Sequence, residues 1–424
     1  MSSAPGIPTT EIDPIGVEPE ELVPALRALA RRAPLHRLPS GEYLVVTQAG
    51  VRDVLKNVDS FSGTVGDVGA LAEEDTMLSG IPEPRHGMVR RIVNSALAYH
   101  HASLVEPYVR DLAATLIGET LAAAAADPDG TVEIMSTFAR RIPSAVIARI
   151  LGIAADDYEL FARWSDEVLA RQENDGGSNR PLLDLHPEFT RFITDQVEQR
   201  RAAANPPSDV ITRLLTSEVD GEHLTTRAVC TQAMFLVVAG NETTRNLIGN
   251  VLRRLALEDG LLAQIHADPA LIPRFVEESL RLEAPVQLTA RTCTRDIEVD
   301  GVQVRKGDRV VLSLQAANRD ETLYPDPDTF RLDRPRPRDH VGFGAGPHVC
   351  PGAYLARMET QVALEAFSHA VEEIRPAPGY VDDPNPVYWA HGPRTLRVKL
   401  TSRAVPYDDR RSPAPAGSRS SVED

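Results

Sequence analysis

The 424-residue sequence predicts a mostly α-helical protein with a minor β region. Length alone allows one large domain or two to three ordinary ones. Apolar residues recur at helical spacing in several long segments, among them 104–126, 132–151, 156–170 and 225–258. Segments typical of strands are shorter, and they lie at 42–47, 297–302, 309–314 and 395–400.

Composition excludes some classes of protein. The chain has 45 basic and 61 acidic residues, so its net charge of −16 argues against a nucleic-acid binder. The first residues lack a basic segment followed by an apolar one, and no window of about 20 apolar residues occurs. The three cysteines, Cys230, Cys293 and Cys350, are widely separated, which argues against a disulfide framework. We therefore expect a cytoplasmic protein without a membrane anchor.

The segment 341–359, VGFGAGPHVCPGAYLARME, places a single cysteine between a glycine-rich loop and a helical pattern that opens at Pro351. A helix N-terminus carries partial positive charge and free N–H groups, which lower a thiol pKa. Cys350 is therefore predicted to be a thiolate. The glycines let the backbone approach a flat, bulky group, and Phe343 can pack beside it. A thiolate in this setting suits a haem iron ligand, and the alternative is a buried structural cysteine near a turn.

The pattern Phe343-Gly344-x-Gly346-x-His348-x-Cys350-x-Gly352 resembles the haem-ligand loop of the cytochrome P-450 family of haem-thiolate monooxygenases. The resemblance implies haem b as cofactor and Cys350 as the ligand of its iron. It also implies that four further loop residues contact the cofactor, namely Phe343, Gly344, His348 and Gly352.

The long helical segment 225–258 carries polar residues within an apolar stretch, MFLVVAGNETTRN. A glycine, a carboxylate and a hydroxyl inside a buried helix are locally unfavourable, and such conflicts tend to mark functional sites. The sequence Ala239-Gly240-x-Glu242-Thr243 matches the oxygen-binding motif of the resembled family. This implies that Ala239 and Gly240 contact the cofactor and that Glu242 and Thr243 are catalytic and deliver protons during dioxygen activation. A kinked helix without chemistry is the alternative.

Two basic pairs are candidates for binding carboxylates. His86 and Arg90 lie four residues apart and share a helix face, a pattern that equally fits a solvated basic surface. The resemblance implies that this pair holds one haem propionate. It also implies that Arg291, together with His348, holds the other.

Glu278 and Arg281 lie three residues apart on a helix whose neighbouring positions are apolar, so we expect this ion pair to be buried. A buried charge needs full pairing, and a third partner is therefore expected. The resemblance implies that Arg334 is that partner and that the group is structural rather than catalytic.

The substrate pocket is the least specified part of the sequence. The segment 58–84 is too irregular and too long for an ordinary connection, and in the resembled family it lies over the pocket. The segment 172–181 contains Gly176 and Gly177 and is either a hinge that opens for substrate or a plain solvent loop. Candidate pocket residues are Val65, Val68, Leu71, Val237, Val286, Leu288 and Val387.

The resemblance spans about residues 58–400 and implies one catalytic domain, 19–403, which encloses haem between the long helix and the Cys350 loop. Residues 1–18 are expected to form an extended arm, and the polar, Pro- and Ser-rich segment 404–424 is expected to be disordered.

The implied activity inserts one oxygen atom from O2 into a C–H bond of a hydrophobic small molecule, such as a terpenoid, steroid, fatty acid or natural-product intermediate. Electrons would come from a separate ferredoxin and ferredoxin reductase, because no reductase domain is fused. An acidic ferredoxin is expected to dock where arginines gather near Cys350, the candidates being Arg90, Arg91, Arg336, Arg338 and Arg357. Alternatives are peroxide-driven, coupling or rearrangement chemistry, and a haem sensor without catalytic activity.

Overall fold

The computed structural model describes residues 10, 19–64, 69–97, 99–153, 158–174, 180–219 and 221–403. The predicted tail and most of the predicted arm lie outside these ranges. So do the pocket candidates Val65 and Val68 and the glycine pair of the predicted hinge. Thr10 is buried, and its N–H donates to Arg37 O at 3.1 Å.

Helices make up most of the described chain, as predicted. The longer ones are α1 Pro19–Ala30, α2 Gln48–Lys56, α3 Arg85–Ala96, α4 Tyr99–Ala126, α5 Arg141–Ile150, α6 Tyr158–Asn174, α8 Pro187–Ala202, α10 Thr226–Leu257, α12 Ile272–Leu282 and α14 Ala353–Ala370. Short helices are α7 Leu182–Leu185, α9 Val210–Thr216, α11 Leu261–Ala267 and α13 Leu314–Ala317. The Thr225 hydroxyl caps α10 by accepting the N–H of Ala228 at 3.1 Å, which satisfies one free donor of the first turn.

Within the described ranges, the β region consists of two small sheets and two hairpins. The five-stranded sheet has the order β1-β2-β10-β7-β3, in which only the β2–β10 pair is parallel. Its strands are β1 Leu35–Arg37, β2 Tyr43–Val45, β3 Phe61–Ser62, β7 Leu288–Cys293 and β10 Arg309–Ser313. The three-stranded sheet consists of β4 Thr131–Glu133, β11 Val371–Pro376 and β12 Arg397–Ser402, and the hairpins pair β5 Glu218–Val219 with β6 Glu222–His223 and β8 Ile297–Val299 with β9 Val302–Val304.

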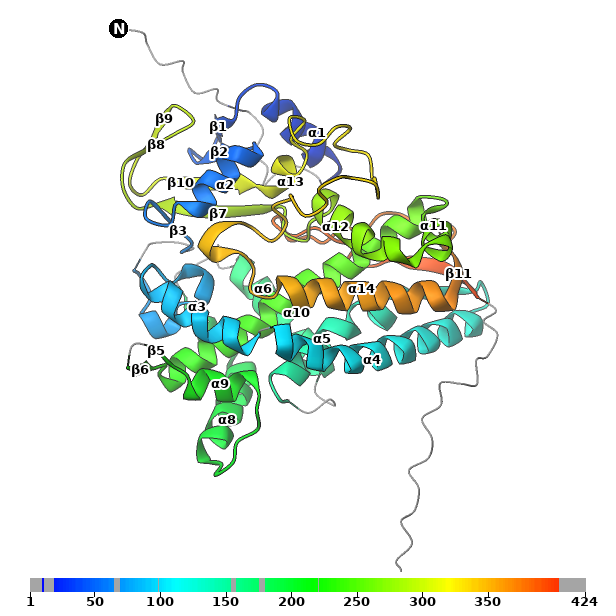
Figure 1. The fold of residues 1–424 in the computed structure, drawn as a ribbon, viewed down its shortest axis with the longest axis horizontal. Helices are drawn as coiled ribbons and strands as arrows, with labels where there is room; N and C mark the ends of the chain where they lie inside the picture. Colours follow the sequence, from blue (N-terminus) through cyan, green and yellow to red (C-terminus); the bar gives the residue numbers. More distant parts are fainter. Residues whose placement is uncertain are drawn as a thin grey trace, which may run out of the picture.

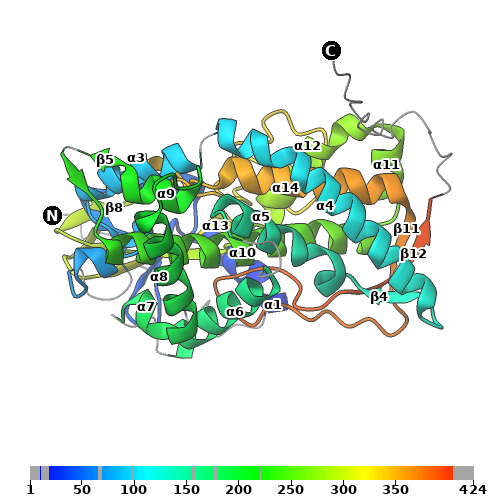
Figure 2. The ribbon, with the colours of Figure 1, turned by 90° about the horizontal axis from the view of Figure 1, so that it is seen from below.

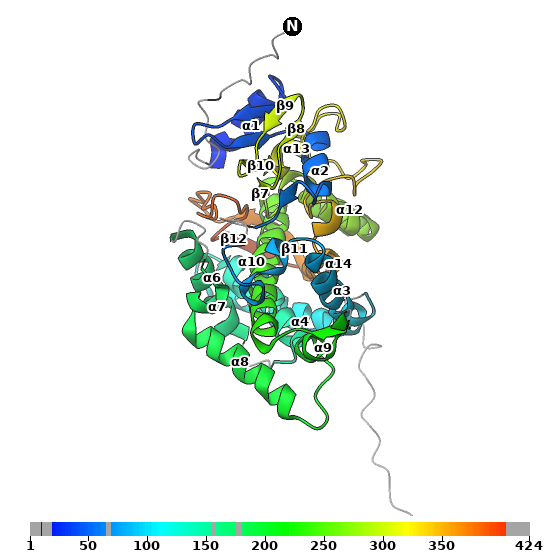
Figure 3. The ribbon, with the colours of Figure 1, turned by 90° about the vertical axis from the view of Figure 1, so that its left-hand side faces the viewer.

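Helix α10 runs through the middle of the molecule. Figure 3 shows it between the five-stranded sheet at one end and α8 at the other. One part of α10 packs in the core shared with α4 and α14, which lie side by side in Figures 1 and 2. Another part packs in the core shared with α6 and α8. Because both cores bury α10, its polar residues need partners inside the protein.

The segment 132–151, expected to be one helix, is divided. Val132 belongs to β4, where it pairs with Val398, and a π-helix over Met135–Ala139 follows before α5 begins. Pro143 lies in the first turn of α5, where a missing N–H costs nothing, so it does not kink a continuous helix. Among the described residues, no helix is both long enough and apolar enough to cross a lipid bilayer.

Candidate active site

The loop before α14 is shaped by glycines. Gly344 and Gly346 have φ angles of +75° and +70°, a conformation that side-chain-bearing residues rarely adopt. A Cβ at Gly346 would also lie 2.8 Å from Leu55 O, so the loop packs directly on the end of α2. The N–H of Cys350 donates to Phe343 O at 2.9 Å, which closes the loop and fixes the thiol before the first turn of α14.

An internal cavity of about 320 Å³ lies between α10, α3, β7 and this loop. All ten residues predicted to bind the cofactor line it: His86, Arg90, Ala239, Gly240, Arg291, Phe343, Gly344, His348, Cys350 and Gly352. They come from four segments far apart in the sequence. The fold therefore brings the residues of the thiol loop and of the helix motif to one space.

The Cys350 thiol faces this cavity, but its pKa differs from the expectation. Burial raises the pKa, and the Gly352 N–H and the positive charges of Arg90 and Arg357 offset only part of that effect. The predicted lowering is therefore not seen for the protein chain alone. Cys350 is an exposed residue, but the protein around its sulfur raises the pKa more than the helix end and the two arginines lower it. A coordinated cation supplies the missing charge and deprotonates a thiol outright.

Two histidines and two arginines gather at one side of the cavity: His86, His348, Arg90 and Arg291. His86 is buried, and its Nδ1 is 2.8 Å from Glu83 Oε1, while its Nε2 has no hydrogen-bond partner among the described residues. The His86 ring stacks on that of His348 at 3.8 Å between centroids. Burial, together with the neighbouring His86, Arg291 and Arg90, lowers the pKa of His348 to about 3. Glu83 is the acid that pairs with this group, through His86, and the other three side chains have no acidic partner among the described residues.

The two arginines strengthen this conclusion. Arg291 donates to Ala290 O at 2.8 Å and approaches Thr289 Oγ1 at 3.4 Å, and burial lowers its pKa to about 10. Arg90 donates to Val349 O, and burial lowers its pKa too. Within the described part of the chain, neither arginine forms an ion pair with an acidic residue. A buried cation needs a counter-charge, so this donor set fits a ligand that carries carboxylates, as the two propionates of haem do.

The acid and the alcohol of the α10 motif face different ways. The Thr243 hydroxyl lines the cavity and donates to Ala239 O at 2.8 Å. Glu242 does not line the cavity, because its side chain lies on another side of α10 than that of Thr243. Its carboxylate accepts from Asn246 Nδ2 at 3.0 Å and contacts Arg245 and Asn385. Arg245 in turn lies 2.9 Å from Asp166 of α6, so Glu242 is held within an ion-pair network rather than beside Thr243.

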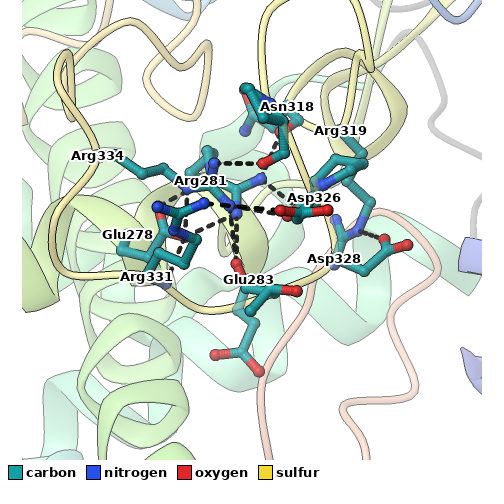
Figure 4. Close-up of polar contacts among 12 residues, drawn as sticks. Glu278, Arg281, Glu283, Asn318, Arg319, Asp326, Asp328, Arg331 and Arg334 are labelled. Carbon is teal, nitrogen blue, oxygen red and sulfur yellow. Dashed lines mark hydrogen bonds and ion pairs between the residues drawn. The ribbon is translucent and has the colours of Figure 1, made fainter.

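Glu278 and Arg281 of α12 form a fully paired group behind the thiol loop (Figure 4). Arg281 Nε and Nη2 donate to the two carboxylate oxygens of Glu278 at 2.9 and 2.7 Å. Arg334 lies where a third partner was expected, and its Nε donates to Glu278 Oε1 at 2.8 Å. The remaining Arg281 donors reach backbone oxygens of the meander, those of Asn318, Pro327 and Thr329.

Most of the predicted pocket residues do not face the cavity. Val286 lines it, but Val237 and Leu288 are buried in other cores, and neither Leu71 nor Val387 reaches it. In β7 the side chains alternate between faces, so Thr289 and Arg291 point to the cavity and Leu288 points away. The apolar side chains that the prediction missed include Leu55, Leu78, Leu97, Ile147, Phe235 and Leu236.

The sequence contained a pattern that could have identified some of these missed residues. On α10, Leu236, Gly240, Thr243 and Leu247 recur at spacings of three to four residues, and all four line the cavity. Extending the stripe from Gly240 and Thr243 selects Leu236 instead of Val237. Glu359 of α14 also lines the cavity, and nothing in the sequence singled it out.

The comparisons with known proteins agree with this geometry. The family model described as Cytochrome P450 matches residues 180–370. The cyclomarin C epoxidase CymV of Salinispora arenicola is 32% identical over 88% of this chain and 94% of that protein. Among solved structures, CYP109Q5 from Chondromyces apiculatus has a TM-score of 0.81 and 32% identity over 93% of this chain and 99% of that one.

A second solved structure is that of CYP109E1 from Bacillus megaterium in complex with testosterone. It has a TM-score of 0.78 and 27% identity, and the match covers 89% of this chain and 98% of that one. A relative above 30% identity that aligns over most of both chains shares more than the fold with this protein. The chain belongs to the cytochrome P450 family of haem-dependent monooxygenases.

Proposed function

We propose that the enzyme hydroxylates a hydrophobic small molecule, a terpenoid, steroid, fatty acid or natural-product intermediate, in the cytoplasm. Haem b is the proposed cofactor, and a ferredoxin with its ferredoxin reductase supplies the electrons. The observation that carries the proposal is the cavity, where a thiol lies opposite a largely apolar stripe of α10 and carboxylate-binding donors lie at the side. When bound, haem supplies one-electron and dioxygen chemistry that no side chain can perform.

The residues of the chain divide the remaining work. Cys350 is the proposed ligand of the iron, and His86, Arg90, Arg291 and His348 hold the propionates. The side chains of Leu236 and Leu247 bound the cavity along α10, exclude water and favour an apolar substrate. Thr243 Oγ1 keeps its proton on Ala239 O at 2.8 Å, which leaves its lone pairs free to accept a hydrogen bond from the cavity.

Glu242 has a conditional role in this proposal. Its carboxylate must leave Arg245, Asn246 or Asn385 before it can deliver a proton toward Thr243. This confinement is also the observation that favours the alternative of peroxide-driven chemistry, which needs less proton delivery. Product formation with hydrogen peroxide and no reductase distinguishes the two uses.

The proposed docking surface for the ferredoxin is narrower than the sequence indicated. Arg90 lines the cavity and is therefore not available to the docking surface. Arg336 and Arg338 each have 71% of the side chain exposed, Arg91 is exposed, and Arg357 lies behind them. If an acidic ferredoxin docks there, its rate of reducing the haem falls as salt is added, because screening weakens exposed charge pairs. A rate independent of salt would contradict electrostatic docking.

The central test is spectroscopic. The reduced protein under carbon monoxide should show the far-shifted Soret peak of thiolate ligation, and Cys350→Ser should abolish it. A Cys350→Ser protein that kept the peak would contradict the assignment. Ligand-induced shifts of the haem spectrum across a lipophilic library then narrow the substrate class. A haem sensor without catalytic activity would show the peak but form no product with any ligand and electron source.

A further inference from the structure

Glu277 of α12 is a buried acid that the proposed chemistry does not use. It is 2% exposed and lies beside Glu278, but the two carboxylates face different groups. Burial opposes its ionisation, yet the hydrogen bonds and charges of His340 and Arg357 lower its pKa to about 2. Glu277 is therefore an anion inside the protein.

The partners of Glu277 fix its hydrogen-bond pattern. The N–H of Gly342 donates to His340 Nδ1 at 3.1 Å, so the ring hydrogen lies on Nε2 and points to Glu277 Oε2 at 2.9 Å. Burial lowers the pKa of His340, which keeps the ring neutral. Arg357 donates to both Glu277 oxygens, from Nε at 2.6 Å and from Nη2 at 3.0 Å.

Arg357 connects this acid with the thiol loop. Its guanidinium carbon lies 4.5 Å from the centre of the Phe343 ring, in a cation–π contact. Phe343 lines the cavity, and its carbonyl accepts the N–H of Cys350 at 2.9 Å. The position of Arg357 therefore bears on the ring and on the loop that present the thiol.

Arg338 connects the same acid with the surface. Its Nε lies 3.4 Å from Glu277 Oε1, while 71% of its side chain is exposed. One buried carboxylate thus holds a surface cation of the proposed docking face and an inner cation beside the cofactor cavity. By contrast, the surface cation Arg336 pairs with Asp339 at 3.1 Å, a half-exposed acid outside this group.

We propose that Glu277 is a positioning residue for electron transfer, which holds Arg338 for an acidic electron donor and Arg357 over Phe343 beside the thiol loop. The docking half of this inference rests on the proposed function. The loop half does not, because it concerns the haem's own reduction potential. An anion near a haem opposes the addition of an electron, so removing the charge of Glu277 makes that potential more positive.

The experiment compares two charge-neutralising variants of the haem-loaded protein. Glu277→Gln and Asp339→Asn each remove one negative charge beside an exposed arginine, but only the first touches the Arg357–Phe343 contact. Because Glu277 holds Arg338 in place, Glu277→Gln is expected to slow reduction by an acidic ferredoxin several-fold at low salt, whereas Asp339→Asn is not. The rates should converge at high salt. Only Glu277→Gln should shift the reduction potential, measured by spectroelectrochemistry with small-molecule mediators.

Each outcome separates the two proposals. A potential shift in Glu277→Gln that Asp339→Asn lacks supports the inference, even if no ferredoxin reduces either protein, in which case the proposed electron donor is wrong. Equal potentials in both variants overturn it. If Glu277→Gln does not bind haem, Arg357→Lys tests the same contact with the positive charge kept. Lysine cannot donate to two carboxylate oxygens at once or stack flat on the Phe343 ring. It should shift the potential, whereas Arg336→Lys should not, and an unchanged potential in Arg357→Lys would equally overturn the inference.

Discussion

Two groups of buried charge stand on opposite sides of the thiol loop, and they differ in how the chain satisfies them. Behind the loop, Arg281 is 1% exposed and donates to both oxygens of Glu278 and to three backbone carbonyls. In front of it, Thr289 and Ala290 alone hold Arg291 among the residues that the structure describes, and within the same part of the chain His86 Nε2 has no partner. Both groups are rich in arginine, so residue type does not distinguish them.

The difference lies in whether the protein completes the hydrogen bonds itself. A buried cation with every donor used stabilises the fold and has no capacity left for a ligand. A buried cation without an acid costs free energy until something supplies the charge. The unpaired group therefore identifies the binding site, and the paired group identifies the wall behind it.

The largest expected effect comes from the paired group. Arg281→Met leaves Glu278 buried with half of its charge compensation lost, so we expect the free energy of unfolding to fall by about 3–5 kcal/mol. Denaturant unfolding followed by circular dichroism measures it. Arg331→Met is the matched control, because Arg331 pairs with exposed Asp333 in the same meander and should have little effect. Equal losses in the two variants would contradict the distinction between them.

The second prediction concerns a buried acid at the cavity. Glu359 is 3% exposed, its Oε2 has no hydrogen-bond partner, and burial raises its pKa from 4.5 to about 8. Between those pH values the folded state binds a proton that the unfolded state has released, so stability falls as pH rises through this window. Each pKa unit corresponds to about 1.4 kcal/mol, which makes the total loss on the order of a few kcal/mol.

The measurement for Glu359 is unfolding at several pH values between 5 and 8.5. Glu359→Gln cannot ionise, so its stability relative to the wild type should increase steadily across that range. A pH-independent difference between the two proteins would show that Glu359 has a partner in solution. This prediction extends the comparison of paired and unpaired buried arginines to a buried carboxyl group without a partner.

The third prediction concerns the unpaired cation. Arg291→Met removes the proposed charge-assisted contact with a propionate, worth about 1.5–3 kcal/mol, so haem should dissociate roughly 10–100 times faster. Transfer of haem to a scavenging protein measures the rate. Arg295→Met, just past the end of the same strand, removes a cation that donates to Ser60 and should leave the rate unchanged. If Arg291→Met loses haem no faster than the wild type, the protein itself provides the partners that Arg291 needs.

The helical fold is as predicted, and the residues predicted to bind the cofactor line one cavity, because both signals are local in the sequence. A window of about twenty residues is enough to identify the helix that carries Gly240 and Thr243, and the same holds for the loop that carries Cys350. Strand β4 was missed because the segment around Val132 is a strand only through its pairing with β12, where Val132 lies opposite Val398, far along the chain. The apolar spacing within the segment predicts a helix and contains no information about that distant partner.

Side-chain direction was predicted less well than position. Val237 and Leu288 are one residue out of phase with Leu236 and Thr289, and a shift of one residue moves a side chain to another face. Glu242 was placed beside Thr243 because the two are adjacent in sequence, but the partner Asn385 comes from a distant loop. Arg90 was expected both at a propionate and on the docking face, and it lines the cavity. These errors all concern tertiary neighbours.

The smallest expected effect tests a group that is satisfied and yet faces the cavity. Thr243 donates to Ala239 O, so Thr243→Ala should barely change stability, but it removes the one α10 hydroxyl that the proposal uses in proton delivery. Product formed per NADH consumed should fall several-fold while hydrogen peroxide rises. Thr231→Ala is the control, since the Thr231 hydroxyl also lies on α10 and reaches backbone oxygens, Arg227 O at 3.0 Å and Glu74 O at 2.8 Å, but does not line the cavity. If Thr243→Ala forms as much product per NADH as the wild type, the Thr243 hydroxyl has a structural role only, although it lines the cavity. Hydrogen bonds completed within the chain would then mark structural groups in the cavity as they do at Arg281.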